Sequence, residues 1–195
     1  MVIWATALLE SSGVESPRLD AECLLASLLG RDRLQLYAAA EERMPPPVCE
    51  VYRTLLSRRR AREPLAYLTG TKEFWSLSFG VTPDVLIPRP ETETLVETAL
   101  ARLNELQAPV IADIGTGSGA IAVALVTALP HSRLYATEIS SRALDVARAN
   151  AARHGVLERI TFFHGDLVEP LLCPGFGLQC DLMVSNPPYV ATEEL

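Results

Sequence analysis

The sequence has few residues of several types that mark particular classes of protein. Its 195 residues include one lysine, three histidines and four cysteines, and no two cysteines form a CxxC pair. Scattered cysteines disfavour both a zinc site and a disulfide framework, so the expected setting is a reducing, cytoplasmic one. The longest apolar stretch, Ala120 to Leu129, is far shorter than the roughly 20 residues that span a bilayer. Because the first residues also lack a basic segment, we expect neither a membrane span nor a secretory signal.

Basic residues are outnumbered, with 17 against 24 acidic residues, a net charge of −7 and a pI near 5.0. Proteins that bind nucleic acid by neutralising phosphates usually carry a basic face, so we do not expect direct nucleic-acid binding. The charge is unevenly spread, since residues 1–72 hold 10 basic and 9 acidic residues, whereas residues 73–195 hold 7 and 15. This difference indicates two parts with different surfaces.

Residues 1–72 are expected to form a small helical domain. A run of leucines follows Ser16 and Pro17 and ends at Gly30, and this cap, proline, apolar stripe and glycine stop predict a helix. Apolar spacing predicts three further helices, over residues 4–9, 34–40 and 48–56. The basic run Arg58-Arg59-Arg60-Ala61-Arg62 is interpreted as a solvated helix face, with contact to a protein substrate or nearby RNA as the alternative.

Residues 73–90 are expected to form a β-hairpin that links the two parts. Apolar and small residues alternate from Trp75 to Val81, and Thr82-Pro83-Asp84 then leads into a second apolar stretch, Val85 to Ile87. Residues 91–195 begin with an amphipathic helix over residues 95–103 and then alternate strand and helix. This alternation predicts the α/β class, with a Rossmann-like parallel sheet covered by helices on both faces. The expected strands are 110–114, 134–138, 160–164 and 181–185, and the helices between them are 120–129 and 142–153.

Three strand ends carry candidate ligand-binding residues. The glycine-rich segment 113–119, Asp-Ile-Gly-Thr-Gly-Ser-Gly, follows the first strand, and its glycines let the backbone turn sharply and approach a ligand. Glu138 ends the second strand, where it could accept hydrogen bonds from ribose hydroxyls. After the third strand, Asp166 could accept from an adenine amino group, and the apolar Leu167 could lie on the ring. The carboxyl ends of parallel strands line one crevice, so we expect a nucleotide-like cofactor there.

The fourth strand is followed by Asn186-Pro187-Pro188-Tyr189, in which two prolines stiffen the loop. An amide nitrogen is a poor nucleophile because its lone pair is delocalised into the carbonyl group. The side-chain oxygen of Asn186 and the carbonyl oxygen of Pro187 could accept the two amide hydrogens and aim the nitrogen at a methyl donor. Tyr189 could pack against the flat substrate group.

Together these motifs resemble those of class I S-adenosylmethionine-dependent methyltransferases that act on planar amide or exocyclic amino nitrogens. Two more segments, Pro64-Leu-Ala-Tyr-Leu-Thr-Gly70 and Leu86-Ile-Pro-Arg-Pro-Glu-Thr-Glu93, resemble the HemK/PrmC family of peptide chain release factor N5-glutamine methyltransferases. The similarity covers essentially the whole chain. It implies methyl transfer from S-adenosylmethionine, leaving S-adenosylhomocysteine, to the glutamine of the release factor GGQ loop in translation termination.

The resemblance also implies a role for each motif residue. Residues 1–72 would recognise the release factor, residues 91–195 would bind the cofactor, and the protein would be monomeric and free of metal. The segment Pro90–Glu93 favours the release factor over a ribosomal protein as substrate. Implied cofactor-binding residues are Asp113, Ile114, Gly115, Thr116, Gly117, Glu138, Asp166, Leu167 and Asn186; implied catalytic residues are Asn186, Pro187 and Tyr189, which with Pro188 also bind the substrate.

Other interpretations stay open at this point. The glycine segment alone also fits an NAD-binding oxidoreductase, and the motif at 186–189 also suits a DNA or RNA amino-group methyltransferase. The sequence ends at Leu195, whereas the resembled family continues through further strands, so we expect this chain to have very low turnover. A cofactor-binding module without activity is therefore a third alternative. None of the three histidines is expected to act as a catalytic base, because the methylated amide can lose its proton to water.

Overall fold

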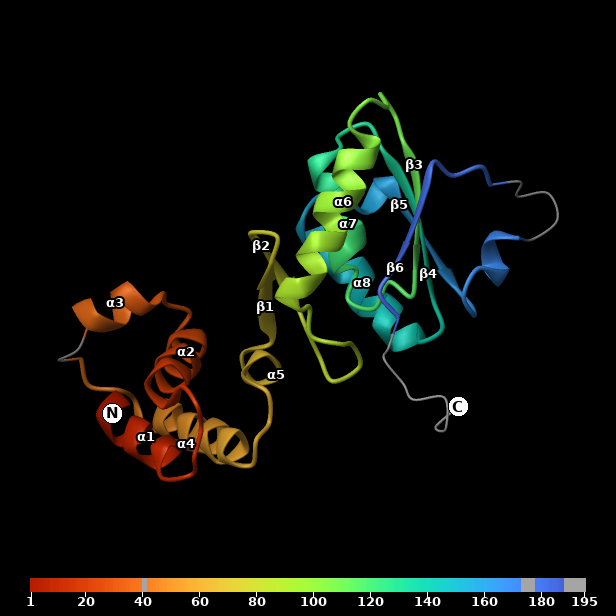
Figure 1. Cartoon of the computed structure of the whole chain (residues 1–195). Coiled ribbons are helices and arrows are strands. Elements are labelled where there is room, and N and C mark those ends of the chain that lie inside the picture. The colour runs from red at the N-terminus through yellow and green to blue at the C-terminus, as the bar shows by residue number, and fades with distance from the viewer. Residues whose placement is uncertain (40–41, 173–177, 188–195) are drawn as a thin grey trace. The chain divides into compact units, whose positions relative to one another are not determined.

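A computed structural model describes residues 1–39, 42–172 and 178–187, and the chain forms two compact units, Met1–Gly70 (unit 1) and Thr71–Leu195 (unit 2). The last residue of unit 1, Gly70, ends a short helix in the left-handed conformation, with φ of 72°. The hairpin, which is predicted to link the two parts, belongs to unit 2. The units are described one at a time (Figure 1).

Unit 1 is a bundle of helices around a small apolar core. Leu9, Leu24 and Leu56 are fully buried there together with Tyr52, whose hydroxyl donates to the Ala21 carbonyl oxygen at 2.8 Å. Four helices confirm the predictions, and a fifth, of five residues, is missed because one turn carries no periodic pattern. The helices are α1 (Val2–Glu10), α2 (Pro17–Leu29), α3 (Arg33–Ala38), α4 (Pro46–Arg60) and α5 (Leu65–Thr69).

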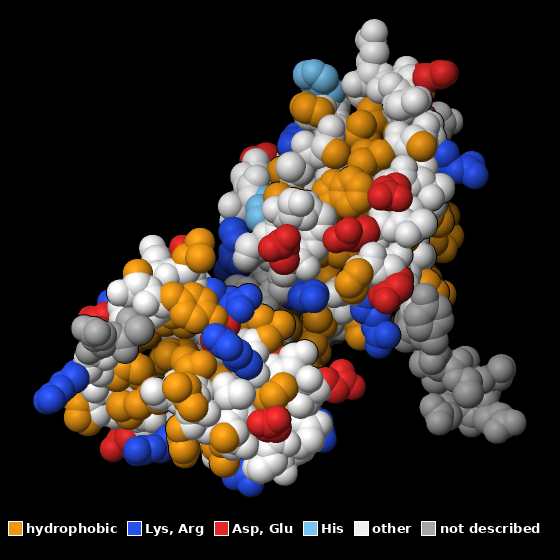
Figure 2. All heavy atoms as spheres, turned by 60° about the vertical axis from the view of Figure 1, so that its left-hand side comes forward, with side chains coloured by type: hydrophobic (Ala, Val, Ile, Leu, Met, Phe, Trp, Pro, Cys, Tyr) orange, Lys and Arg blue, Asp and Glu red, His pale blue; other side chains and the backbone are white. Residues whose placement is uncertain are grey.

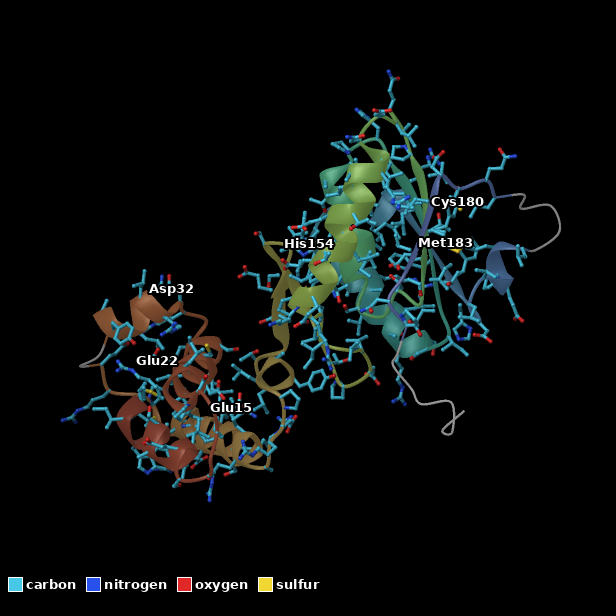
Figure 3. All side chains as sticks on the ribbon, in the orientation of Figure 1. Glu15, Glu22, Asp32, His154, Cys180 and Met183 are labelled. Atoms are coloured by element: carbon cyan, nitrogen blue, oxygen red, sulfur yellow. The ribbon has the colours of Figure 1, made fainter. Side chains whose placement is uncertain are left out.

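A buried carboxylate joins α2 to α3. Glu22 is 2% exposed and accepts hydrogen bonds from the Tyr37 hydroxyl at 2.5 Å, from Arg18 Nε at 2.9 Å and from Arg33 Nη2 at 2.6 Å (Figure 3). The Tyr37 hydroxyl and the two guanidinium groups outweigh the cost of burial and lower the pKa of Glu22 to about 2. The residue is therefore ionised at neutral pH and fully partnered.

The basic run at the end of α4 is held within unit 1. Arg58 pairs with Glu63, and Arg59 donates to Asp20 at 2.7 Å. Arg60 donates to the Ser12 hydroxyl, and Arg62 donates to the Ser12 carbonyl oxygen, both at 3.0 Å. These contacts brace helices against one another, so the run has a structural role of its own.

The hairpin of unit 2 is present, but its turn is not where the sequence predicts it. Strand β1 (Thr71–Phe74) pairs with β2 (Leu77–Gly80), so Trp75 and Ser76 form a two-residue turn. Both turn residues are left-handed, with φ of 52° and 56°, which is the geometry that matches the twist of paired strands. The predicted strand at 85–87 is absent. This part of the prediction is wrong because the alternation of apolar and small residues continues through the actual turn, which contains no glycine.

The main sheet of unit 2 is parallel, with strand order β5-β4-β3-β6, which confirms the α/β class. Its strands closely match the predicted ones. They are β3 (Val110–Ile114), β4 (Arg133–Glu138), β5 (Ile160–His164) and β6 (Leu182–Ser185); the helices are α6 (Glu93–Leu103), α7 (Ala120–Ala128) and α8 (Ser141–Arg153), with short 3-10 helices at Pro90–Thr92, Leu157–Arg159 and Glu169–Leu171.

The prediction of helices on both faces is wrong for the part of unit 2 that the structure describes. Helices α6, α7 and α8 all cover one face, burying Leu134 and Val184 among others, whereas Leu171 and its neighbours cover the other face (Figure 1). The chain moves from β3 to β4 to β5 in one direction. Because each such crossover is right-handed, α7 and α8 must lie on the same side. Among the described residues between β5 and β6, Val168, Leu171 and Leu178 pack on the opposite face.

Candidate functional site

The candidate residues meet where the strand order reverses. The first connections carry the chain from β3 to β4 and β5, and the last strand, β6, then pairs with β3 on its other side. Ile114 is in register with Ser185 of β6 and with Thr137 of β4. The glycine loop and Asn186 therefore leave neighbouring strands at the same edge, which is where ligands bind in open α/β sheets.

The loop between β3 and α7 is tied to β4 by its backbone. The N–H groups of Gly115 and Thr116 both donate to the Thr137 carbonyl oxygen, at 2.9 and 3.0 Å. Gly117 is left-handed, with φ of 56°, and an added Cβ there would meet no atom within 4 Å. Glycine is thus required at this position by the backbone conformation, and the outer side of the loop is open.

Asp113, at the base of this loop, is completely buried. Its Oδ2 accepts a hydrogen bond from the Thr116 hydroxyl at 2.7 Å, while Oδ1 has no hydrogen-bond partner among the described residues. Burial raises the pKa of Asp113 to about 6, the Thr116 hydrogen bond opposes this, and the nearby charge of Glu138 adds to it. A perturbed pKa and an unsatisfied buried oxygen at one residue are features typical of functional sites.

Glu138, at the end of β4, holds the loop from its other side. Its Oε2 accepts from the Gly117 N–H, and its Oε1 accepts from the Ser140 N–H, each at 3.0 Å. A carboxylate has about four acceptor positions, so two remain for a ligand. The same side chain thus shapes the glycine loop and offers acceptors beside it.

The end of β5 exposes the third predicted group. Asp166 is exposed, and Leu167 is 65% exposed and left-handed, with φ of 43°. A leucine in this conformation is strained, which is typical of functional loops. Ile139, directly after Glu138, is 64% exposed and was not predicted as a site residue. The signal available in the sequence was an apolar residue directly after the candidate ribose ligand Glu138.

Asn186 is half-buried just beyond β6, and its Nδ2 lies 3.2 Å from the Thr92 hydroxyl oxygen. Thr92 belongs to the segment Pro90–Glu93, and the next residue, Glu93, accepts a hydrogen bond from the Trp75 N–H at 2.8 Å. This segment therefore touches both the asparagine and the hairpin turn, a role that sequence reasoning missed. Pro187 is exposed, and the predicted Pro188 and Tyr189 lie outside the described residues.

Within 1–39, 42–172 and 178–187, no cluster of three histidine, cysteine or carboxylate side chains is arranged to hold a metal ion. No helix in these ranges has the length and apolar character needed to cross a membrane.

Comparison with known proteins identifies both units. The family model for the PrmC N-terminal domain matches residues 1–70, and the model for the methyltransferase small domain matches residues 91–195. The release factor glutamine methyltransferase of Moorella thermoacetica is 48% identical over 187 residues, and that of Geobacter sulfurreducens is 47% identical over 192. These matches cover 96% and 98% of this chain but 65% of each relative.

A solved structure is similar in fold to this chain. The N-terminal domain of human METTL16 has a TM-score of 0.52 at 22% identity, and the match covers 66% of this chain and 53% of that one. At this identity the likeness supports the architecture of the sheet and helices.

Proposed function

The chain belongs to the methyltransferase small domain family, and on that premise we propose that it binds S-adenosylmethionine and is part of a release factor glutamine methyltransferase. The transferred methyl group would go to the side-chain amide nitrogen of the glutamine in the GGQ loop. The observation that carries the proposal is the register of β3 with β6, which brings the open glycine loop and Asn186 to adjacent strand ends.

The cradle at the ends of β3, β4 and β5 fits the cofactor. The unpartnered Oδ1 of Asp113 lies at the base of the loop, and the outer side of Gly117 is open. Glu138 keeps two acceptor positions that suit ribose hydroxyls, and the exposed Leu167 and Ile139 suit the adenine ring. When bound, S-adenosylmethionine supplies a sulfonium methyl group that a nucleophile can displace.

The chain's own residues supply positioning. They would place the glutamine nitrogen against the sulfonium methyl group that the bound cofactor would supply, and the proton that the methylated amide gives up would pass to water. Asn186 and the Pro187 carbonyl oxygen would hold the amide so that its lone pair points at the methyl carbon. In this scheme Pro188 and Tyr189 complete the substrate site. The rate enhancement comes more from alignment of the reacting atoms than from a general base.

Unit 1 would contact the release factor. It contains a cavity of about 890 Å³ lined by α1, α2, α3 and the segment that follows, and Glu22 and Tyr37 form part of its wall. On the face shown in Figure 2, hydrophobic side chains gather over unit 1. Ile3 and Leu34 are among the most exposed apolar residues of this unit, at 88% and 79%. An apolar surface of this kind suits a protein partner.

The test is calorimetric titration of the chain with S-adenosylhomocysteine, repeated with Glu138→Gln and Asp113→Ala. Glu138→Gln keeps the shape of the side chain but removes the charged acceptors, and Asp113→Ala removes the buried carboxyl group. Both variants are expected to bind S-adenosylhomocysteine at least tenfold more weakly. Glu158→Gln, in the turn before β5, is the matched control and should bind like the original chain. A folded chain that binds NADH instead, or that binds neither ligand, would contradict the proposal.

A further inference from the structure

Asn150 is a polar residue on the buried face of α8, where its neighbours are apolar. It is 1% exposed, and Ala143, Leu144, Ala147 and Ala151 on the same helix are also buried. A buried carboxamide costs free energy unless it is hydrogen-bonded. Its partners therefore indicate why an asparagine stands there.

The carboxamide of Asn150 joins two segments that are far apart in the sequence. Its Nδ2 donates to the Ser118 carbonyl oxygen and to the Gly80 carbonyl oxygen, both at 2.9 Å. Its Oδ1 accepts from the Gly80 N–H at 2.7 Å. Gly80 ends the hairpin, and Ser118 belongs to the glycine loop, so one side chain bonds to both.

The backbone around these contacts leaves little freedom. Ala147 lies one turn before Asn150 on the same face of α8, and a Cβ added to Gly119 would lie 3.1 Å from the Ala147 Cβ. A Cβ added to Gly80 would lie 3.3 Å from the Asn150 Oδ1. Helix α8 therefore meets the end of the glycine loop and the end of the hairpin at close range.

The hairpin is attached to α8 at a second point. His154, at the end of the helix, places its Nε2 2.9 Å from the Ser78 carbonyl oxygen, and its ring lies 5.3 Å from that of Phe79 (Figure 3). The hairpin and the helix thus form one packed layer behind the glycine loop.

We infer that Asn150 is a positioning residue for the cofactor site, which holds the Ser118 end of the glycine loop in place and couples it to the hairpin. The inference rests on the proposed cofactor site. It adds a residue that touches neither cofactor nor substrate, and it predicts that a change in the hairpin alters cofactor affinity.

The test uses the whole chain and two variants. Asn150→Asp keeps the shape and the acceptor for the Gly80 N–H, but removes both donated hydrogen bonds and sets a charge against two carbonyl oxygens. Binding of S-adenosylhomocysteine should weaken at least tenfold, and amide hydrogen exchange at Gly117 and Gly119 should accelerate more than at the buried Leu125 of α7. Gly80→Ala, which presses on the carboxamide from the hairpin, should have the same effects to a smaller degree, with at least twofold weaker binding.

The control is Leu103→Ala, which empties a buried position of α6 away from the loop. This substitution should accelerate amide hydrogen exchange throughout unit 2, with no larger effect in the glycine loop than elsewhere. If both Asn150→Asp and Gly80→Ala leave loop exchange unchanged relative to Leu125, the inference is overturned. If the original chain fails to bind S-adenosylhomocysteine, the proposed cofactor site fails, whereas the exchange measurements still decide the role of Asn150. Should Asn150→Asp not fold, Gly80→Ala decides alone.

Discussion

Replacing Asp113 with asparagine should change how the stability of unit 2 depends on pH. The pKa of this buried carboxyl is about 6, against 3.8 for an ordinary aspartate. Between these values the folded chain binds more protons than the unfolded chain, so the stability of the original chain falls as pH rises through this window. The loss of stability amounts to about 3 kcal/mol at pH 7, and it is absent below about pH 3.

Asparagine does not titrate, so the Asp113→Asn variant does not lose this stability as pH rises. The variant also changes packing and hydrogen bonding, but those costs are the same at each pH and cancel when two pH values are compared. We therefore expect the variant to gain about 2 kcal/mol relative to the original chain between pH 4 and pH 7.

Urea denaturation followed by tryptophan fluorescence measures this gain. The chain has two tryptophans, and replacing the half-exposed Trp4 with phenylalanine leaves Trp75 as a reporter of unit 2. Asp145→Asn, at an exposed position on α8, is the control and should show little change. If the free-energy difference between Asp113→Asn and the original chain is equal at both pH values, the reasoning about a buried, destabilising carboxylate is wrong.

Three more changes have expected outcomes. Glu22→Gln should destabilise unit 1 at pH 7, because it removes a carboxylate whose pKa is lowered to about 2. In the original chain this stabilisation is lost as pH falls from 4.5 towards about 2, which the fluorescence of Trp4 would follow once Trp75 is replaced with phenylalanine. Thr92→Val removes the hydroxyl that lies against the Asn186 carboxamide, so a GGQ peptide should bind at least threefold more weakly by calorimetry, whereas the exposed Thr98→Val should not affect it. Gly119→Ala forces a side chain into a left-handed position against α8, and thermal denaturation should show a loss of about 1–3 kcal/mol.

Much of unit 2 could be predicted from the sequence because its signals are local. The strand at 110–114 has the predicted bounds, since an apolar run between a proline and a glycine loop leaves few alternatives. Asp113, Glu138 and Asp166 could be proposed because each lies within two residues of the end of such a strand, and parallel strands end at one edge. The hairpin turn could not be placed, because Trp75 and Ser76 are left-handed without being glycine, and their conformation is supported by a distant residue, Glu93.

The residues that sequence reasoning missed share a different property. Asn150 and Thr92 lie on a long helix and a short one, not on the loops after strands, and each acts through a partner at least 32 residues away in the sequence. The local sequence pattern predicts that Asn150 lies in a helix, but it does not indicate that Ser118 and Gly80 are its hydrogen-bond partners. A polar residue in the apolar stripe of an amphipathic helix is nevertheless a signal, because its buried hydrogen-bonding groups require partners. Searching a helix for such positions would have pointed to Asn150, although only the fold could identify the glycine loop as its partner.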